Sequence, residues 1–256
     1  MTRDRNLVAL VLAAGEGTRM KSPLAKVLHT VCGRPMIRYV LDTVRSISPA
    51  RILVVVGHQA DAVREELTGE AVEFVIQTER LGTGHAVMMA EPALRGYSGT
   101  IIALNGDTPL LKPATLDGLL QFHWDRAASA TVLSALLDDP QGYGRIVRDD
   151  SGRLLRIVEH RDATEAQRSI NEINSGIFCF ESDELFETLP KLSRRNVQGE
   201  YYITDVIELL REQGAPVAIY RSEQKEEVLG INDTGQLEAA ERSMIGDGQD
   251  IRTMEE

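Results

Sequence analysis

The sequence predicts an α/β fold, with a mostly parallel sheet and helices on both of its faces. Short apolar runs alternate with segments of helical periodicity through the first half of the chain, as they do in consecutive β–α–β units. The first run, residues 7–12, is apolar throughout, which is typical of a buried strand. The chain has 256 residues, enough to bury one large core with a small appended subdomain.

The elements of the first half follow from this alternation. A helix is expected to open at Arg34-Pro35, because apolar side chains from Met36 to Val44 share one helical face and proline suits a first turn. The further expected strands are 52–56, 72–76 and 100–104, and the further expected helices are 61–67, 84–90 and 115–126.

The β–α rhythm loosens after Asp138. Short strands are expected at 145–147, 154–158 and 176–180, followed by a helix at 202–212. Another helix is expected after Asn232, and the polar stretch 246–256 is expected to be loosely ordered.

The composition narrows the class of protein. The chain carries 39 acidic and 28 basic residues, a net charge of −11, which argues against binding to nucleic acid or to a membrane surface. Cys32 and Cys179 lie far apart among apolar neighbours and are expected to be reduced. No apolar run is long enough for a signal peptide or a membrane span. These observations predict a cytoplasmic protein.

The most informative stretch follows the first strand and reads Leu-Ala-Ala-Gly-Glu-Gly-Thr-Arg-Met from Leu12 to Met20. Its two glycines leave backbone N–H groups uncovered, so a phosphate can approach closely. Arg19, Lys21 and Lys26 follow with no acidic residue between 18 and 26. In an acidic protein, this cation cluster beside a glycine loop predicts a site for a polyanion.

Two other phosphate-binding motifs do not fit this loop. The Gly-x-x-x-x-Gly-Lys-Ser/Thr pattern of a Walker A loop is absent, and Met20 stands where the third glycine of a dinucleotide fingerprint belongs. A plain glycine turn between strand and helix, with solvated lysines, is the remaining alternative.

Asp107 lies in Leu-Asn-Gly-Asp-Thr-Pro, at the carboxyl end of an expected strand. Ligands of open α/β sheets bind at that edge, and Gly106 permits close approach there. Mg²⁺ takes one or two protein oxygens and completes its shell with phosphate oxygens and water, so Asp107 suits a divalent cation. The alternative is an aspartate that starts a turn.

Gln77 begins the string Gln-Thr-Glu-Arg-Leu-Gly-Thr-Gly-His, which links a strand to a helix. A glutamine amide presents a donor and an acceptor, which suits the imide edge of uracil. Gly82 and Thr83 could add backbone and hydroxyl contacts. A capped helix start is the alternative, and it is compatible with this function.

Several polar strings of the second half lie at the ends of expected strands, where they suit sugar hydroxyls and an acetamido group, although each alone resembles ordinary turn composition. They are Gly142–Arg145, Glu159–Asp162, Asn174–Gly176 and Gly199–Asp205. Asn232 precedes an expected helix, where an asparagine commonly caps the first turn. The five histidines show no metal-ligand spacing, and none is assigned a catalytic role.

Together these strings resemble the sugar-phosphate nucleotidylyltransferases, and specifically the N-acetylglucosamine-1-phosphate uridylyltransferase (pyrophosphorylase) domains of the GlmU type. The resemblance runs from about residue 7 to about residue 243. It implies a Rossmann-like (GT-A-like), mostly parallel mixed sheet flanked by helices, with a smaller β-rich subdomain for the sugar. The implied division is a nucleotidylyltransferase domain at 1–243, mainly nucleotide-binding at 1–137 and mainly sugar-binding at 138–232, followed by a polar tail at 244–256.

The resemblance also implies the reaction. Such domains transfer a uridylyl group from UTP to N-acetyl-α-D-glucosamine 1-phosphate, with Mg²⁺, giving pyrophosphate and UDP-N-acetylglucosamine, a precursor of peptidoglycan and lipopolysaccharide. The acceptor phosphate has a second pKa of about 6, so it is a dianion near neutral pH and needs no general base. Direct in-line displacement is expected.

The site residues carry over by position. Leu12, Ala13, Ala14, Gly15, Gln77, Gly82 and Thr83 would surround the uridine, with Asn105 and Gly106 also lining the substrate site. Arg19 and Lys26 would face the phosphates, and Gly144, Glu159 and Asn174 would hold the sugar. Asp107 and Asn232 would hold the Mg²⁺, and Arg19, Lys26 and Asp107 would be catalytic.

Three residues depart from the family pattern. Asn105 stands where an aromatic residue often precedes Gly-Asp, Ala25 replaces the usual proline before Lys26, and Thr234 stands where a basic residue can follow the Asn232 motif. None of them removes a residue that the chemistry needs.

GlmU-type proteins also carry an acetyltransferase half built from hexapeptide repeats. Nothing in this sequence matches that period, so neither acetyl transfer nor a repeat-organised trimer is expected. Two alternatives remain: a nucleotidylyltransferase for another sugar phosphate, such as glucose 1-phosphate, and a non-catalytic regulator that binds nucleotide sugars.

Overall fold

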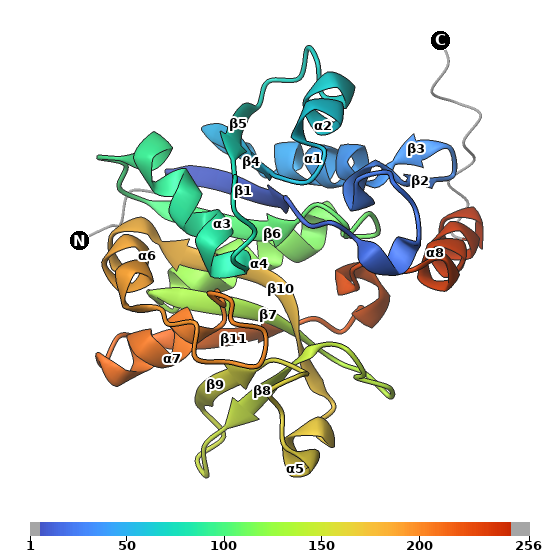
Figure 1. The fold of residues 1–256 in the computed structure, drawn as a ribbon. Coiled ribbons are helices and arrows are strands. Elements are labelled where there is room, and N and C mark those ends of the chain that lie inside the picture. Colours follow the sequence, from blue (N-terminus) through green and yellow to red (C-terminus); the bar gives the residue numbers. More distant parts are fainter. Residues whose placement is uncertain (1–5, 247–256) are drawn as a thin grey trace.

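The computed structural model describes residues 6–246 and places a twisted mixed sheet at the centre of the molecule (Figure 1). The main path of the sheet has the order β11-β7-β10-β6-β1-β4-β5, and β8 and β9 extend it from β10. Within residues 6–246, six of the seven strands on that path run in one direction, and β10 runs against them. The predicted α/β class with a mostly parallel mixed sheet is confirmed.

The strands of the nucleotide half are the expected ones, within one residue at each end. They are β1 (Leu7–Ala13), β4 (Arg51–Val56), β5 (Glu73–Ile76) and β6 (Thr100–Asn105). A short hairpin of β2 (Thr30–Val31) and β3 (Arg34–Pro35) precedes the first helix. The expected helix start was therefore wrong by two residues, because Arg34 and Pro35 pair with the preceding strand.

Helices cover both faces of the sheet (Figure 1). Alternate residues of β1 divide between the two cores: Val11 packs in the core that contains α1, α2 and α4, and Leu10 packs in the core that contains α3, α6 and α7. The helices are α1 (Met36–Ser46), α2 (Ala60–Glu66), α3 (Thr83–Ala90), α4 (Pro113–Asp125), α5 (Glu165–Arg168), α6 (Ser182–Thr188), α7 (Asp205–Glu212) and α8 (Thr234–Gly246). The C-terminal tail expected from residue 244 thus begins inside α8, and 247–256 lie outside the described residues.

The second half adds the remaining strands, and β8, β9 and α5 extend downward from the sheet in Figure 1. They are β7 (Ala130–Leu136), β8 (Gly144–Arg148), β9 (Leu154–Val158), β10 (Glu172–Glu181) and β11 (Val217–Arg221). The sequence analysis did not anticipate β7, β11 or α6. In β7, buried Thr131 and Ser134 interrupt the apolar pattern, and their hydroxyl groups are partnered by His123 and Glu172 from elsewhere in the chain.

An irregularity in β10 joins the two halves. The pairing of β10 with β7 shifts register between Asn174 and Phe178. Before the shift, Asn174 pairs with Gly144 of β8; after it, Phe178 pairs with Ala103 of β6. Gly176 lies inside the shift with a φ of 81°, and a Cβ there would collide with the Asn105 side chain. One strand therefore crosses from the central sheet to the smaller subdomain at the predicted site.

No helix among residues 6–246 is long and apolar enough to cross a membrane.

Candidate active site

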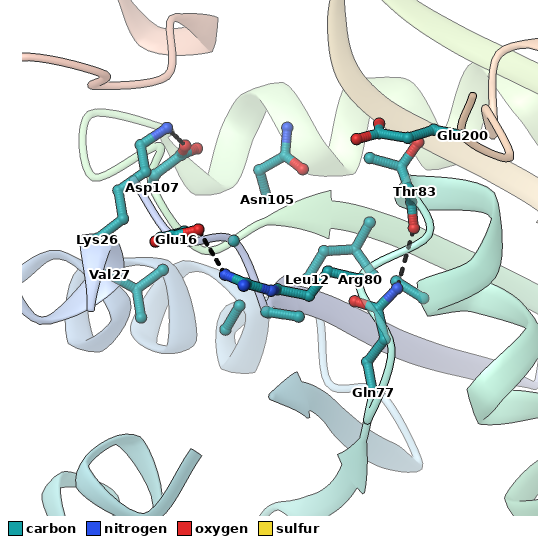
Figure 2. Close-up of a pocket in the computed structure, with 15 residues that line it drawn as sticks. Leu12, Glu16, Lys26, Val27, Gln77, Arg80, Thr83, Asn105, Asp107 and Glu200 are labelled. Carbon is teal, nitrogen blue, oxygen red and sulfur yellow. Dashed lines mark hydrogen bonds and ion pairs between the residues drawn. The ribbon is translucent and has the colours of Figure 1, made fainter. Parts of the chain in front are cut away.

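Two adjoining cavities open at the carboxyl ends of β1 and β6, where ligands of open α/β sheets bind. The larger measures about 490 Å³ and is drawn in Figure 2; the smaller measures about 190 Å³. Four residues line both: Leu12, Thr83, Asn105 and Asp107.

The structure brings nearly all of the predicted site residues to these cavities. The larger is lined by Leu12, Ala13, Ala14, Gly15, Lys26, Gln77, Gly82, Thr83, Asn105 and Asp107, and the smaller adds Arg19, Gly144, Glu159, Asn174 and Asn232. Gly106 lines neither cavity. Its N–H donates to the Leu12 carbonyl over 2.9 Å, and a Cβ there would lie 3.0 Å from Val27 Cγ1, so its role in the structure is close packing below the site.

Gly15 and Gly17 of the glycine loop have different structural roles. Gly15 faces open space, with nothing within 4 Å of a Cβ built on it. Gly17 has a φ of 66°, and its Cβ would lie 2.6 Å from Lys26 Cβ. Only glycine combines that backbone conformation with that close approach. Gly15 therefore leaves room for a ligand, and Gly17 lets the chain of Lys26 pass beside the loop.

Lys26 is the centre of a polar cluster between the cavities. Its ammonium group forms an ion pair with Asp107 Oδ2 and donates to Asn232 Oδ1 over 2.7 Å. The Arg19 guanidinium donates to the same Asn232 oxygen over 2.7 Å. Figure 2 shows Lys26 and Asp107 side by side at one end of the larger cavity. Two cations thus converge on the two oxygen-bearing side chains predicted to hold Mg²⁺.

The surroundings of Asp107 fit a hard cation. Asp107 Oδ1 is buried without a hydrogen-bond partner among the described residues, and a Cβ at Gly230 would lie 3.0 Å from it. The chain around Asp107 is tied to the Asn232 segment, because Ile231 N–H donates to the Asp107 carbonyl over 2.9 Å. No cluster of three or more His, Cys, Asp or Glu side chains suited to a metal occurs within residues 6–246. One carboxylate and one amide suit an ion that takes its other oxygens from phosphate and water.

Gln77 lies at the opposite end of the larger cavity (Figure 2). It is 4% exposed, and its amide nitrogen donates to the Gly82 carbonyl over 3.1 Å. Thr83 Oγ1 accepts the Ile203 N–H over 3.1 Å, which fixes this loop against the loop that precedes α7. Gly82 has a φ of 102°, and a side chain there would meet the Tyr201 backbone.

The sequence analysis missed one charged pair in the larger cavity. Arg80 Nη1 and Glu16 Oε2 lie 2.6 Å apart, with each side chain 48% exposed. In Figure 2 this pair crosses the space between the Lys26 end and the Gln77 end. Both residues lie inside strings already singled out, but only the folded chain places them opposite one another.

The smaller cavity combines a carboxyl, an amide and backbone. Glu159 Oε1 accepts from the Thr204 hydroxyl over 3.0 Å, and the surrounding protein raises the pKa of the Glu159 carboxyl by desolvation. Asn174 Oδ1 accepts the Gly176 N–H over 2.9 Å, which leaves the Asn174 NH₂ group as its outward donor. Burial, reinforced by the negative charge of Asp107, raises the pKa of Tyr143 to about 12. This cavity therefore offers donors and acceptors suited to hydroxyl and amide groups.

Two of the three departures from the family pattern have structural explanations. Ala25 N–H donates to Gln59 Oε1 over 2.8 Å, a bond that proline could not make. The Asn105 side chain occupies the space that Gly176 leaves open, at the border of both cavities. Thr234 begins α8, and nothing in the structure explains it further.

Comparison with known proteins identifies the family. The sequence profile described as nucleotidyl transferase matches residues 8–244. The chain belongs to the nucleotidyl transferase family. The bifunctional protein GlmU of Brevibacillus brevis is 53% identical over 236 residues, which cover 92% of this chain and 51% of that protein. The GlmU of Halalkalibacterium halodurans is 51% identical over 239 residues, covering 93% of this chain and 52% of that protein.

The chain thus spans about half the length of these curated relatives. The profile match runs from β1 into α8, so it includes both cavities and the polar cluster between them. The predicted relationship to GlmU-type nucleotidyl transferases is confirmed.

Proposed function

We propose that this chain transfers a uridylyl group from UTP to N-acetyl-α-D-glucosamine 1-phosphate and releases pyrophosphate. The observation that carries the proposal is the position of Asp107, Lys26 and Arg19 where a large and a small cavity meet. A nucleotide in the larger cavity and a sugar phosphate in the smaller would bring their phosphates together at these side chains. The GlmU relatives support the choice of substrates.

In the larger cavity, the uracil would lie at the Gln77 end and the triphosphate along the glycine loop toward Lys26. The open face of Gly15 gives a phosphate access to backbone N–H groups. In the smaller cavity, Glu159, Asn174 and the Gly144 backbone would hold the sugar hydroxyls and acetamide. Each half of the reaction would therefore have its own pocket.

The acceptor phosphate would attack the α-phosphorus directly, because its dianion is already a nucleophile near neutral pH. The difficulty is to bring that dianion to a nucleotide with about four negative charges of its own. Arg19 and Lys26 would neutralise and orient the phosphates, so that the attacking oxygen and the leaving pyrophosphate lie in line. Asp107 and Asn232 would hold Mg²⁺, which when bound supplies further charge neutralisation at phosphate oxygens.

The decisive experiment measures pyrophosphate release from purified protein with UTP and a series of sugar 1-phosphates. N-acetylglucosamine 1-phosphate should give a higher kcat/KM than glucosamine 1-phosphate, because a pocket built for the acetamide keeps unpaired polar groups without it, a cost of about 1–3 kcal/mol. Glucose 1-phosphate as the better acceptor would replace this proposal with the alternative sugar. Binding of UDP-N-acetylglucosamine without turnover would indicate the non-catalytic regulator.

The remaining expectations concern the cellular location, the partners, the oligomeric state and the cysteines of the protein. A cytoplasmic location, the lack of nucleic-acid and membrane partners and the lack of a repeat-organised trimer stay predictions. Cys32 and Cys179 are not joined by a disulfide in the structure, and their reduced state also stays a prediction.

A further inference from the structure

We propose that His85 engages the one amide N–H of Gln77 that Gly82 leaves free, so that only the amide oxygen remains to select a base whose ring edge donates an N–H. The inference rests on the proposed placement of a nucleotide base at the Gln77 end of the larger cavity. It assigns a positioning role to His85, a residue that the sequence analysis left without function.

The Gln77 amide has its donor half fully engaged. Its nitrogen donates to the Gly82 carbonyl over 3.1 Å and lies 3.1 Å from His85 Nδ1. The reversed amide would place Oε1 against the Gly82 carbonyl oxygen, two acceptors in contact, so the Gly82 carbonyl defines which end is nitrogen. Within residues 6–246, Gln77 Oε1 accepts no hydrogen bond.

His85 must then act as an acceptor. An imidazole Nδ1 can accept the second amide N–H only if its proton is on Nε2, so the contact selects one neutral tautomer. The ring is held by stacking on Tyr201, with centroids 6.3 Å apart and planes inclined by 26°. Tyr201 is in turn fixed by the bonds of its backbone to Leu81 and Gly84, at 2.7 and 2.8 Å.

These contacts change what the sequence predicted for Gln77. A free glutamine amide could offer both a donor and an acceptor to a base, but this one offers Oε1 alone. Uracil presents N3–H to such an acceptor, whereas cytosine presents the N3 lone pair, which would face Oε1 as a second acceptor. Because an unpaired or opposed buried polar group is costly, the locked amide discriminates between the two bases.

The test compares kcat/KM for UTP and CTP, with N-acetylglucosamine 1-phosphate, in the wild type and three variants. His85→Phe keeps an aromatic ring beside Tyr201 but removes the acceptor. His85→Asn retains an acceptor oxygen near the position of Nδ1. Tyr201→Leu removes the stacking partner and leaves the imidazole. Dissociation constants for UDP and CDP, measured by calorimetry, provide a readout that does not depend on turnover.

We expect His85→Phe to reduce the UTP-to-CTP ratio by about tenfold or more, while His85→Asn preserves most of it. Tyr201→Leu leaves the imidazole acceptor in place, so it should reduce the ratio by less than His85→Phe does, even where it lowers stability. An unchanged ratio in His85→Phe, or equal losses in His85→Phe and Tyr201→Leu, would overturn the role of His85. If the wild type bound UDP more tightly than CDP but turned over neither triphosphate, the proposed reaction would be contradicted. The role of His85 would still be decided by the dissociation constants of the variants for UDP and CDP.

Discussion

Lys26 Nζ donates to Asn232 Oδ1 over 2.7 Å across 206 positions of sequence, and the same ammonium group pairs with Asp107. Both oxygen-bearing partners are the side chains predicted to hold a divalent cation. In this conformation the ammonium group therefore occupies two of the oxygens that the cation would take, Asp107 Oδ2 and Asn232 Oδ1, while Asp107 Oδ1 has no hydrogen-bond partner among the described residues. Under the proposed function, the same three residues would serve two arrangements, one with the lysine on these oxygens and one with the lysine on phosphate.

Asp107→Asn should leave the fold intact and remove most of the activity. The substitution keeps the size of the side chain but removes its charge, and Asp107 is the one carboxylate assigned to the cation. We expect kcat/KM to fall by a factor of the order of 10²–10³, as for the loss of one transition-state electrostatic partner. The melting temperature provides the control for folding. Near-normal turnover in a folded variant would contradict the assignment of Asp107.

Lys26→Ala should have opposite effects on two measurements. Activity should fall by a factor of the order of 10², because the phosphates lose a cation that faces charge redistributed during transfer. Binding of Mn²⁺ in the absence of nucleotide, followed by electron paramagnetic resonance, should instead strengthen severalfold, because the Asp107 and Asn232 oxygens lose their competing ammonium. Lys26→Arg is the matched control, since it keeps the charge but not the compact shape. Unchanged kinetics in Lys26→Ala would make the lysine structural only.

Arg80→Ala tests the charged pair that crosses the larger cavity. Without Arg80, the Glu16 carboxylate lies uncompensated in the loop expected to carry the triphosphate. The KM for UTP should rise about two- to fivefold, as expected for an exposed pair, and the effect should shrink in high salt. The double variant Glu16→Gln/Arg80→Ala should return KM toward the wild-type value. A double variant as impaired as Arg80→Ala would indicate that Arg80 contacts the nucleotide itself.

Asp205 predicts a pH dependence of stability. Desolvation, with the nearby Glu208 and Asp162 charges, raises the pKa of Asp205 from 3.8 to about 6 in the folded protein. Between these values the folded state binds more protons at this site than the unfolded chain, so the site's contribution to the free energy of unfolding falls as pH rises.

Asp205→Asn should therefore stabilise the protein relative to the wild type at pH 7, and the gain should fade as the pH approaches 4. Thermal unfolding across this range measures the effect. Asp183→Asn, which also removes a carboxylate from the first turn of a helix, is the matched control. A difference between Asp205→Asn and wild type that does not change with pH would contradict the raised pKa.

The sequence predicted those parts of the fold whose pattern is local. The strands of the nucleotide half are apolar and the α1 face is periodic, so their positions follow from neighbouring residues alone. β7 was not predicted because Thr131 and Ser134 are buried polar residues that interrupt its apolar pattern, and their partners lie on other elements, His123 on α4 and Glu172 on β10. β11 was not predicted because its side chains are only partly buried, so its sequence lacks the apolar run of a buried strand.

In the candidate site, too, the sequence predicted the features that lie within one segment and missed the contacts between segments. The glycine loop, Asp107 and the Gln77 string could be found because each combines several informative residues within one loop. The Glu16–Arg80 pair and the contact between Gln77 and His85 could not, because both depend on side-chain directions that no spacing rule gives. The acceptor-only character of Gln77 follows from the second of these contacts.

The register shift in β10 determines how the two pockets are spaced. Before the shift, Asn174 pairs with Gly144 of β8 beside the smaller cavity; after it, Phe178 pairs with Ala103 of β6, the strand that ends at Asn105, two residues before Asp107. The two cavities are therefore joined by one strand, β10, instead of a hinged linker. This strand fixes the spacing between them. Under the proposed function, a change confined to β8 and β9 would reshape the smaller cavity for a different sugar and leave the polar cluster of Lys26, Asp107 and Asn232 in place.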